Sequence, residues 1–190
     1  MNLPNQLTVG RFFLTLLFVA ALSVSWRFSN TLALALFTLA GITDYADGEI
    51  ARRYALETNF GKLMDPLVDK IMIAAAFICL VEDHALSAWA AVVIISREFL
   101  ITGLRLLAVS QGVVLAADKY GKHKTAWQMI TVIYLLLLAS AREIWPAFQG
   151  PVFDALRKWG GGGLVALALL LTLYSGFNYL WKNRQLISEM

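Results

Sequence analysis

The stretch that decides the fold is Asp44-Tyr-Ala-Asp47-Gly48-Glu-Ile-Ala51-Arg52, followed after eight residues by Gly61-Lys-Leu-Met-Asp65-Pro-Leu-Val-Asp69. It places four aspartates in sequence that is otherwise apolar enough to cross a membrane. A single charged side chain at the centre of a membrane helix costs about 2.5–3.5 kcal/mol on insertion scales. Four aspartates so close together therefore indicate a site for a positively charged ligand rather than packing.

The composition is that of an integral membrane protein. Of 190 residues, 59% are hydrophobic, and the mean hydropathy is +0.66, whereas an ordinary soluble domain is about 45–50% apolar. The net charge of +3 is too small to favour a nucleic-acid-binding protein. The single cysteine, Cys79, excludes an internal disulfide and a cysteine-based zinc site. Because the N-terminus resembles neither a signal peptide nor a transit peptide, we expect a multi-pass protein of the bacterial plasma (inner) membrane.

Six stretches are expected to span the bilayer, although only the last is free of charge over a full crossing and the other five keep charges at or near one end. They predict an all-α integral membrane protein folded as one six-transmembrane-helix bundle. We expect residues 1–190 to form this single domain. The expected spans are residues 6–26, 31–54, 59–81, 85–109, 124–142 and 160–182. Residues 142–159, with two prolines, are expected to form an interfacial loop, and residues 160–163 a flexible entry to the last helix.

The basic residues predict the orientation of the bundle. With both termini on one side of the membrane, that side carries twelve of the 16 Lys and Arg residues. The other side keeps Arg27, Arg142, Arg157 and Lys158. Since cytoplasmic segments are enriched in Lys and Arg, we expect both termini in the cytoplasm and the active site in the cytoplasmic half.

The spacing of the aspartates predicts that they converge. Asp44 and Asp47 are three residues apart, and Asp65 and Asp69 four apart, so each pair shares a helix face. A turn at residues 55–58 would make the two helices antiparallel. Asp44 would then lie level with Asp69, and Asp47 with Asp65.

Four carboxylates without a nearby His or Cys suit Mg²⁺ or Mn²⁺ rather than zinc. They are enough for two ions about 3.5–4 Å apart, the arrangement that clamps a phosphoryl group during transfer. Gly48 and Ala51 leave a bare patch where a ligand can approach, and Arg52 can neutralise a diphosphate. Lys62 and Lys70 are expected to reach the lipid head groups.

Two other interpretations of the aspartates stay open at this point. They could form structural salt bridges with Arg11, Arg97 and Arg105. They could also line an ion path in a divalent-cation transporter, although transporters more often show paired repeats of broken helices, and none is evident in the sequence.

The spacing D-x2-D-G-x2-A-R-x8-G-x3-D-x3-D resembles the signature of the CDP-alcohol phosphotransferases. The chain meets each fixed position of that signature, with Asp44, Asp47, Gly48, Ala51, Arg52, Gly61, Asp65 and Asp69. Residues 3–11, 96–105 and 121–125 also resemble the branch that uses glycerol 3-phosphate, the phosphatidylglycerophosphate synthases.

The resemblance implies six transmembrane helices, usually in a homodimer, with the active site open to the cytoplasm. Asp44, Asp47 and Asp65 would bind one ion, and Asp44, Asp65 and Asp69 the second, with Asp69 also acting as the general base. The residues that would hold CDP-diacylglycerol are Thr8, Arg11, Gly48, Ala51, Arg52, Thr58 and Gly61.

A second group of basic residues predicts the acceptor. Arg97 lies deep in an expected helix, and Arg105, Lys122 and Lys124 lie nearer the cytoplasmic face. Such a cluster suits an acceptor that carries a phosphate. Alternatively, Arg97 pairs with Glu98 or a site aspartate, and the two lysines contact anionic lipid head groups.

The expected function is the transfer of a phosphatidyl group from CDP-diacylglycerol to glycerol 3-phosphate, which gives phosphatidylglycerophosphate and CMP. The alternatives are the same chemistry with inositol phosphate or serine as acceptor, and a divalent-cation transporter.

Overall fold

The computed structural model of the chain describes residues 3–24, 26–54, 58–110, 112, 119–148 and 150–184. Within these ranges it describes the side chains except those of residues 3–4, 45–54, 59–60, 62–63 and 119–122. The described part of the chain is helical and contains no strand.

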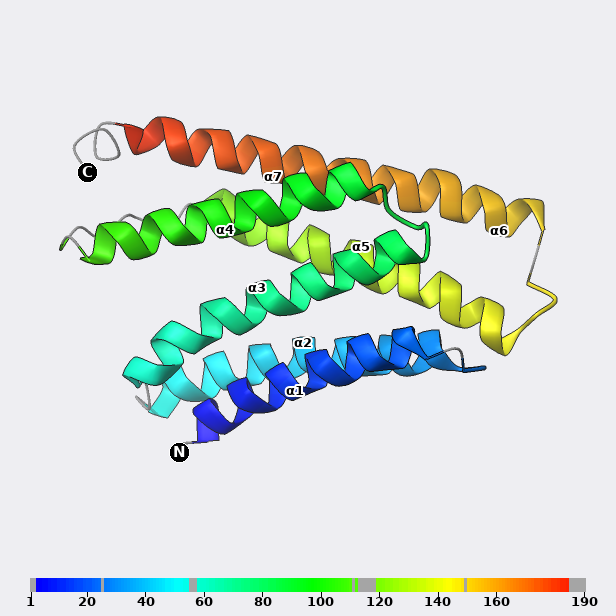
Figure 1. The fold of residues 1–190 in the computed structure, drawn as a ribbon, viewed down its shortest axis with the longest axis horizontal. Helices are drawn as coiled ribbons and strands as arrows, with labels where there is room; N and C mark the ends of the chain where they lie inside the picture. Colours follow the sequence, from blue (N-terminus) through cyan, green and yellow to red (C-terminus); the bar gives the residue numbers. More distant parts are fainter. Residues whose placement is uncertain are drawn as a thin grey trace.

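The helices run back and forth along one bundle (Figure 1). They are α1 (Leu3–Ser23), α2 (Ser29–Tyr54), α3 (Asn59–Glu82), α4 (Ala88–Ser110), α5 (Lys119–Ile144), α6 (Pro151–Ala155), the π-helix η1 (Leu156–Gly161) and α7 (Gly162–Lys182). The last three follow one another without a break as one helical stretch of 32 residues. The beginning of α1, the junction of α2 with α3 and the end of α7 lie at the same end of the bundle (Figure 1).

The first five helices agree with the expected spans to within about five residues at each end, the usual scatter of such boundaries. The expectation for the last connection was wrong. Residues 151–159 are helical rather than an interfacial loop, because Pro151 begins a helix, a position where its missing N–H is not needed. Only residues 145–150 remain between α5 and α6.

The expectation that residues 160–163 form a flexible entry was also wrong. Gly160 and Gly161 are helical and lie against α5, where a Cβ on Gly160 would overlap the phenol of Tyr134. A Cβ on Gly161 would lie 2.8 Å from Cδ2 of Leu135. These glycines therefore allow a close approach of two helices, which sequence alone does not distinguish from flexibility.

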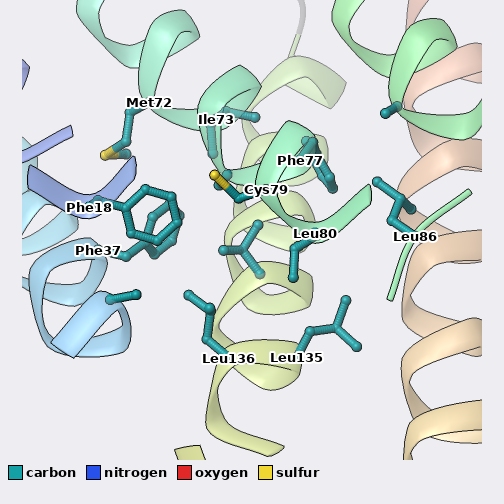
Figure 2. Packing of buried hydrophobic residues seen from close by; sticks show 14 of the residues in the cluster. Phe18, Phe37, Met72, Ile73, Phe77, Cys79, Leu80, Leu86, Leu135 and Leu136 are labelled. Atoms are coloured by element: carbon teal, nitrogen blue, oxygen red, sulfur yellow. The ribbon is translucent and has the colours of Figure 1, made fainter. Parts of the chain in front are cut away.

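Side chains of the helices α1, α2, α3, α4 and α5 form one apolar core (Figure 2). The rings of Phe18 on α1 and Phe37 on α2 lie 5.7 Å apart at an interplanar angle of 50°. Phe77 on α3 and Leu136 on α5 are fully buried in the same core. Several buried members of the core are alanines, which let the helix backbones come close together.

The exposed surface of the bundle is apolar and several of its buried side chains are polar. Phe13, Val92 and Phe177 are each more than half exposed, whereas Arg11 and Gln128 are buried. This arrangement is that of a membrane protein, because lipid solvates apolar side chains and excludes charged ones.

Within the described ranges, three stretches are long and apolar enough to cross a membrane, namely Asn5–Ser23, His123–Ile144 and Pro151–Lys182. Charged residues interrupt α2, α3 and α4, for example Arg97, Glu98 and Arg105 in α4. The chain is therefore an all-helical membrane protein, and the count of six spans stays a prediction.

Candidate functional site

Two aspartates of the α2–α3 hairpin meet at one arginine. Arg11 on α1 is fully buried, and its Nη1 contacts Oδ1 of Asp44 on α2 and Oδ1 of Asp69 on α3. Since one nitrogen touches both carboxylates, these two aspartates lie level with one another on neighbouring helices, which agrees with the spacing argument.

The two carboxylates remain accessible although their arginine is not. The side chains of Asp44 and Asp69 are 39% and 37% exposed, compared with 0% for Arg11. The guanidinium therefore lies beneath the carboxylates, and part of each carboxylate can be reached by a ligand.

Asp65, the third of the four signature aspartates whose side chain the structure describes, lies one turn before Asp69 on α3. Its Oδ1 accepts a hydrogen bond of 2.5 Å from the hydroxyl of Thr8, which is buried on α1. Thr8 and Arg11 are three residues apart and so share a face of α1, and that face holds aspartates of both α2 and α3.

The beginning of α3 is tied to α1 by a cap. Thr58 is the N-cap of α3, where its Oγ1 accepts from the N–H of Gly61 at 3.0 Å and donates to Oδ1 of Asn5 at 2.9 Å. A Cβ on Gly61 would lie 3.1 Å from Oδ1 of Asn5 and 3.7 Å from Oδ2 of Asp65. Gly61 thus leaves room for α1 to approach the aspartates.

The side chains of Asp47, Gly48, Ala51 and Arg52 lie outside the described residues, although their backbone belongs to α2. Among the side chains that the structure does describe, no three His, Cys, Asp or Glu residues form a group that could hold a metal ion.

The described aspartates nevertheless have the chemistry that a hard cation needs. Their donors are carboxylate oxygens, which divalent cations prefer. Asp44 and Asp69 pair with Arg11, as the salt-bridge interpretation expected, and more than a third of each side chain stays exposed to a ligand. The hairpin therefore fits a divalent cation by its donor set and by the exposure of its carboxylates.

A second charged cluster surrounds Glu98 of α4, whose side chain is 5% exposed. Its Oε1 contacts Nζ of Lys124 from α5 and lies 3.5 Å from Nη1 of Arg97. Its Oε2 lies 2.8 Å from Nζ of Lys70, which follows Asp69 on α3. Three cations therefore meet one buried carboxylate, and the four side chains carry a formal charge of +2.

Hydrogen bonds extend this cluster to α7. The amide of Gln128 on α5 donates to Oε1 of Glu98 at 3.5 Å and to Oγ1 of Thr172 at 3.0 Å. Arg97 donates through Nη2 to Oγ of Ser175 at 3.0 Å. Side chains of α3, α4, α5 and α7 thus form one polar network inside the bundle.

The expectation for Lys70 was wrong, because its side chain is only 21% exposed and pairs with Glu98 instead of reaching the lipid head groups. A buried carboxylate attracts a neighbouring ammonium more strongly than hydrated lipid phosphates do. The side chains of Lys62 and Lys122 lie outside the described residues.

Arg105 is directed to α7. Its Nε donates to the hydroxyl of Tyr179 at 3.3 Å, and its guanidinium lies 5.1 Å from the centre of that ring. Of the four basic residues expected at the acceptor site, the structure therefore brings Arg97 and Lys124 together at Glu98, and places Arg105 against Tyr179.

Sequence reasoning missed Asn5, Gln128 and the polar face of α7, and named Glu98 only as a possible partner of Arg97. A signal existed on α7, because Thr172, Ser175 and Tyr179 are spaced by three and four residues in an otherwise apolar run. Such spacing places them on one helix face and predicts a polar interface with a neighbouring helix.

Comparison with known proteins agrees with the signature. The family model of the CDP-alcohol phosphatidyltransferases matches residues 1–174. A protein of Bacillus subtilis (strain 168) is 38% identical over 96% of this chain and 95% of its own length, and bears the name CDP-diacylglycerol–glycerol-3-phosphate 3-phosphatidyltransferase.

Proteins with the same name are similar over nearly their whole length in two further bacteria. The protein of Rickettsia felis is 32% identical over 94% of this chain and 93% of its own length. The protein of Sodalis glossinidius is 31% identical over 100% of this chain and 98% of its own. The match of the family model and these relatives show that the chain belongs to the CDP-alcohol phosphatidyltransferase family.

Proposed function

We propose that this protein transfers the phosphatidyl group of CDP-diacylglycerol to glycerol 3-phosphate, releasing CMP and phosphatidylglycerophosphate. The observation that carries the proposal is the meeting of Asp44 and Asp69 from α2 and α3 at one buried arginine, with part of each carboxylate left accessible. The names of the relatives from three bacteria support both substrates.

Two divalent cations, Mg²⁺ or Mn²⁺, would be held by Asp44, Asp47, Asp65 and Asp69. When bound, such cations neutralise the charge of the diphosphate and of the leaving CMP. Thr8 and Arg11 orient Asp65, Asp44 and Asp69 from α1, as their contacts indicate. The described contacts of Thr58 and Gly61 give them a role in holding α1 against the start of α3.

CDP-diacylglycerol would lie over the beginning of α3, held by Gly48, Ala51 and Arg52 of α2 together with Thr58 and Gly61. Arg52 is assigned to the diphosphate because a guanidinium pairs well with phosphate oxygens. Part of this surface belongs to side chains outside the described residues.

The transfer step uses Asp69 as the base. A carboxylate oxygen of Asp69 takes the proton of the acceptor hydroxyl, and the acceptor oxygen forms a bond to the phosphorus that carries diacylglycerol. The bond from that phosphorus to the bridging oxygen of CMP breaks, and CMP leaves with the electron pair. The 37% exposure of Asp69 supports this role, because an accessible carboxylate can reach a substrate.

The acceptor phosphate would bind at the cluster around Glu98, where three cations face one carboxylate. Arg97 and Lys124 would be its ligands at Glu98. Arg105, which contacts Tyr179, and Lys122, whose side chain lies outside the described residues, are assigned to the same acceptor site. An excess of positive charge inside a membrane protein is costly unless an anion binds there. Serine carries no phosphate to compensate that charge, so the cluster favours glycerol 3-phosphate over serine.

The architecture that we infer for the working enzyme is one domain over residues 1–190 with six spans, assembled as a homodimer in the bacterial inner membrane. Both termini and the active site would face the cytoplasm. The beginning of α1 and the end of α7 lie at the same end of the bundle, which supports an even number of crossings (Figure 1).

The test is an assay of the purified full-length protein with CDP-diacylglycerol, Mg²⁺ and one acceptor at a time. Release of CMP and formation of phosphatidylglycerophosphate only with glycerol 3-phosphate is the expected result. Turnover with inositol phosphate or serine instead would overturn the acceptor assignment. Absence of CMP release with every acceptor, together with Mg²⁺ flux into protein-containing vesicles, would favour a cation transporter.

A further inference from the structure

Glu98 lies at the centre of the acceptor cluster, and we propose that it is a positioning residue that sets the acceptor specificity. In this role it holds Lys70, Arg97 and Lys124 together, so that they present two net positive charges to one phosphate monoester. The inference rests on the proposed function of the cluster, and it assigns to Glu98 a task that differs from contact with the substrate.

Both carboxylate oxygens of Glu98 are engaged by cations from different helices. Oε1 contacts Lys124 of α5 and lies 3.5 Å from Arg97, and Oε2 lies 2.8 Å from Lys70 of α3. Gln128 donates to Oε1 as well, at 3.5 Å. Without the carboxylate, three like charges would repel one another and move apart.

The depth of these side chains separates the positioning residue from the ligands. Glu98 is 5% and Lys124 is 4% exposed, whereas Arg97 is 13% and Lys70 is 21% exposed. The carboxylate therefore lies beneath at least two of the cations that it holds. It holds Arg97 and Lys70 from below and leaves their accessible sides to the acceptor, whereas Lys124 is buried beside it.

The aspartate site has the same construction with the charges reversed. There the buried cation, Arg11 at 0% exposure, lies beneath the accessible carboxylates of Asp44 and Asp69. The two sites are joined in the chain by the neighbours Asp69 and Lys70. In both, one buried counter-ion organises the groups that face the ligand.

The charge of the cluster indicates its ligand. With Glu98 the four side chains sum to +2, which matches the charge of about −1.5 to −2 that a phosphate monoester carries at neutral pH. With glutamine at position 98 the sum becomes +3 and the order imposed by the carboxylate is lost. The chemical class that fits is therefore a small phosphate monoester.

The experiment compares three variants of the full-length protein, Glu98→Gln, Glu98→Asp and Glu143→Gln. Glu143 is the matched control, because it also joins two helices but lies at the other end of α5. Its Oε1 accepts from the N–H of Asn30 at 2.8 Å and its Oε2 from the N–H of Thr31 at 2.9 Å, which ties α5 to the beginning of α2.

In Glu98→Gln the KM for glycerol 3-phosphate should rise about tenfold while the KM for CDP-diacylglycerol stays near that of the wild type. Glu98→Asp keeps the negative charge on a shorter side chain. Its KM for glycerol 3-phosphate should therefore lie between those of the wild type and Glu98→Gln. Glu143→Gln should lower the melting temperature and leave both KM values unchanged.

Equal changes of both KM values in Glu98→Gln, or a lower melting temperature alone, would show that Glu98 is only structural. If Glu98→Gln does not fold, Glu98→Asp decides: an unchanged acceptor KM overturns the proposal and a raised one supports it.

Failure of the proposed function is a separate result, because the wild type would then release no CMP with glycerol 3-phosphate. Calorimetric titration with inorganic phosphate would in that case still test Glu98. Weaker phosphate binding by Glu98→Gln or Glu98→Asp than by the wild type supports the positioning role, and equal binding overturns it.

Discussion

The hydroxyl of Thr8 on α1 donates a hydrogen bond of 2.5 Å to the carboxylate of Asp65 on α3. The first helix, which carries no acidic residue, thereby fixes an aspartate of the hairpin. Because a hydrogen bond to a charged group contributes about 1.5–3 kcal/mol, this contact is strong enough to decide the orientation of the carboxylate.

Thr8→Val keeps the shape of the side chain and removes the donor. We expect kcat/KM to fall about tenfold or more, since Asp65 is no longer held in one orientation. The control is Thr15→Val on the same helix. The hydroxyl of Thr15 donates to the backbone carbonyl oxygen of Arg11, one turn earlier in α1. Steady-state assays of both variants check this, and equal losses would contradict a specific role for Thr8.

Arg11→Met removes the buried guanidinium from beneath Asp44 and Asp69. Without a divalent cation the two carboxylates then repel, and we expect a loss of about 1.5–3 kcal/mol in stability. Added Mg²⁺ should raise the melting temperature of Arg11→Met more than that of the wild type, because the cation replaces the lost charge.

The control for this prediction is Arg142→Met in the last turn of α5, away from the aspartates. The guanidinium of Arg142 lies 6.0 Å from the centre of the Phe153 ring. Its Mg²⁺-induced shift should equal that of the wild type. Melting curves with Mg²⁺ and with a chelator measure the difference. The same shift in Arg11→Met and the wild type would argue against a cation site at these aspartates.

Gly176→Ala tests the placement of Arg97. A Cβ on Gly176 would lie 3.0 Å from Cγ and 3.2 Å from Nε of Arg97, so the arginine must move by a few tenths of an ångström. We expect a severalfold higher KM for glycerol 3-phosphate. Gly163→Ala on the same helix has open space around it and should leave the KM unchanged. Equal KM values for the two variants would contradict the assignment of Arg97.

Gly160→Ala tests the close packing of η1 on α5. The added methyl group would overlap the phenol of Tyr134, whose hydroxyl donates to the carbonyl oxygen of Leu156 at 3.1 Å. We expect a loss of about 1–3 kcal/mol in stability from overpacking. Gly162→Ala, with open space around it, should keep or raise the melting temperature because alanine favours helix. A melting temperature of Gly160→Ala at or above the wild-type value would show that residues 160–163 are not tightly packed.

The orientation of the bundle can be tested with single cysteines. In a Cys79→Ala background, Lys182→Cys lies at the end of α7 and Ser87→Cys in the connection between α3 and α4, and both positions are exposed. A membrane-impermeant maleimide applied to intact cells with a permeabilised outer membrane should label Ser87→Cys and not Lys182→Cys. The opposite pattern would reverse the proposed topology.

The sequence was sufficient to predict the positions of the first five helices. It also predicted that Asp44 and Asp69 lie at the same height on α2 and α3. Both follow from spacing along the chain, because the few residues that separate α2 from α3 and the rise of a helix fix which residues face each other. The last connection could not be predicted in the same way. Glycine and proline mark a loop when counted along the sequence, whereas here Gly160 and Gly161 allow helices to pack closely.

The sequence by itself therefore determined which chemistry the protein carries, since carboxylates at fixed spacing in apolar helices have few other uses. Only the tertiary structure decided which opposite charges meet. Arg11 lies beneath Asp44 and Asp69, and Lys70 turns to Glu98, although these partners are far apart along the chain. The reason is physical: a buried charge must find a counter-ion, and which one it finds depends on how the helices pack rather than on local spacing.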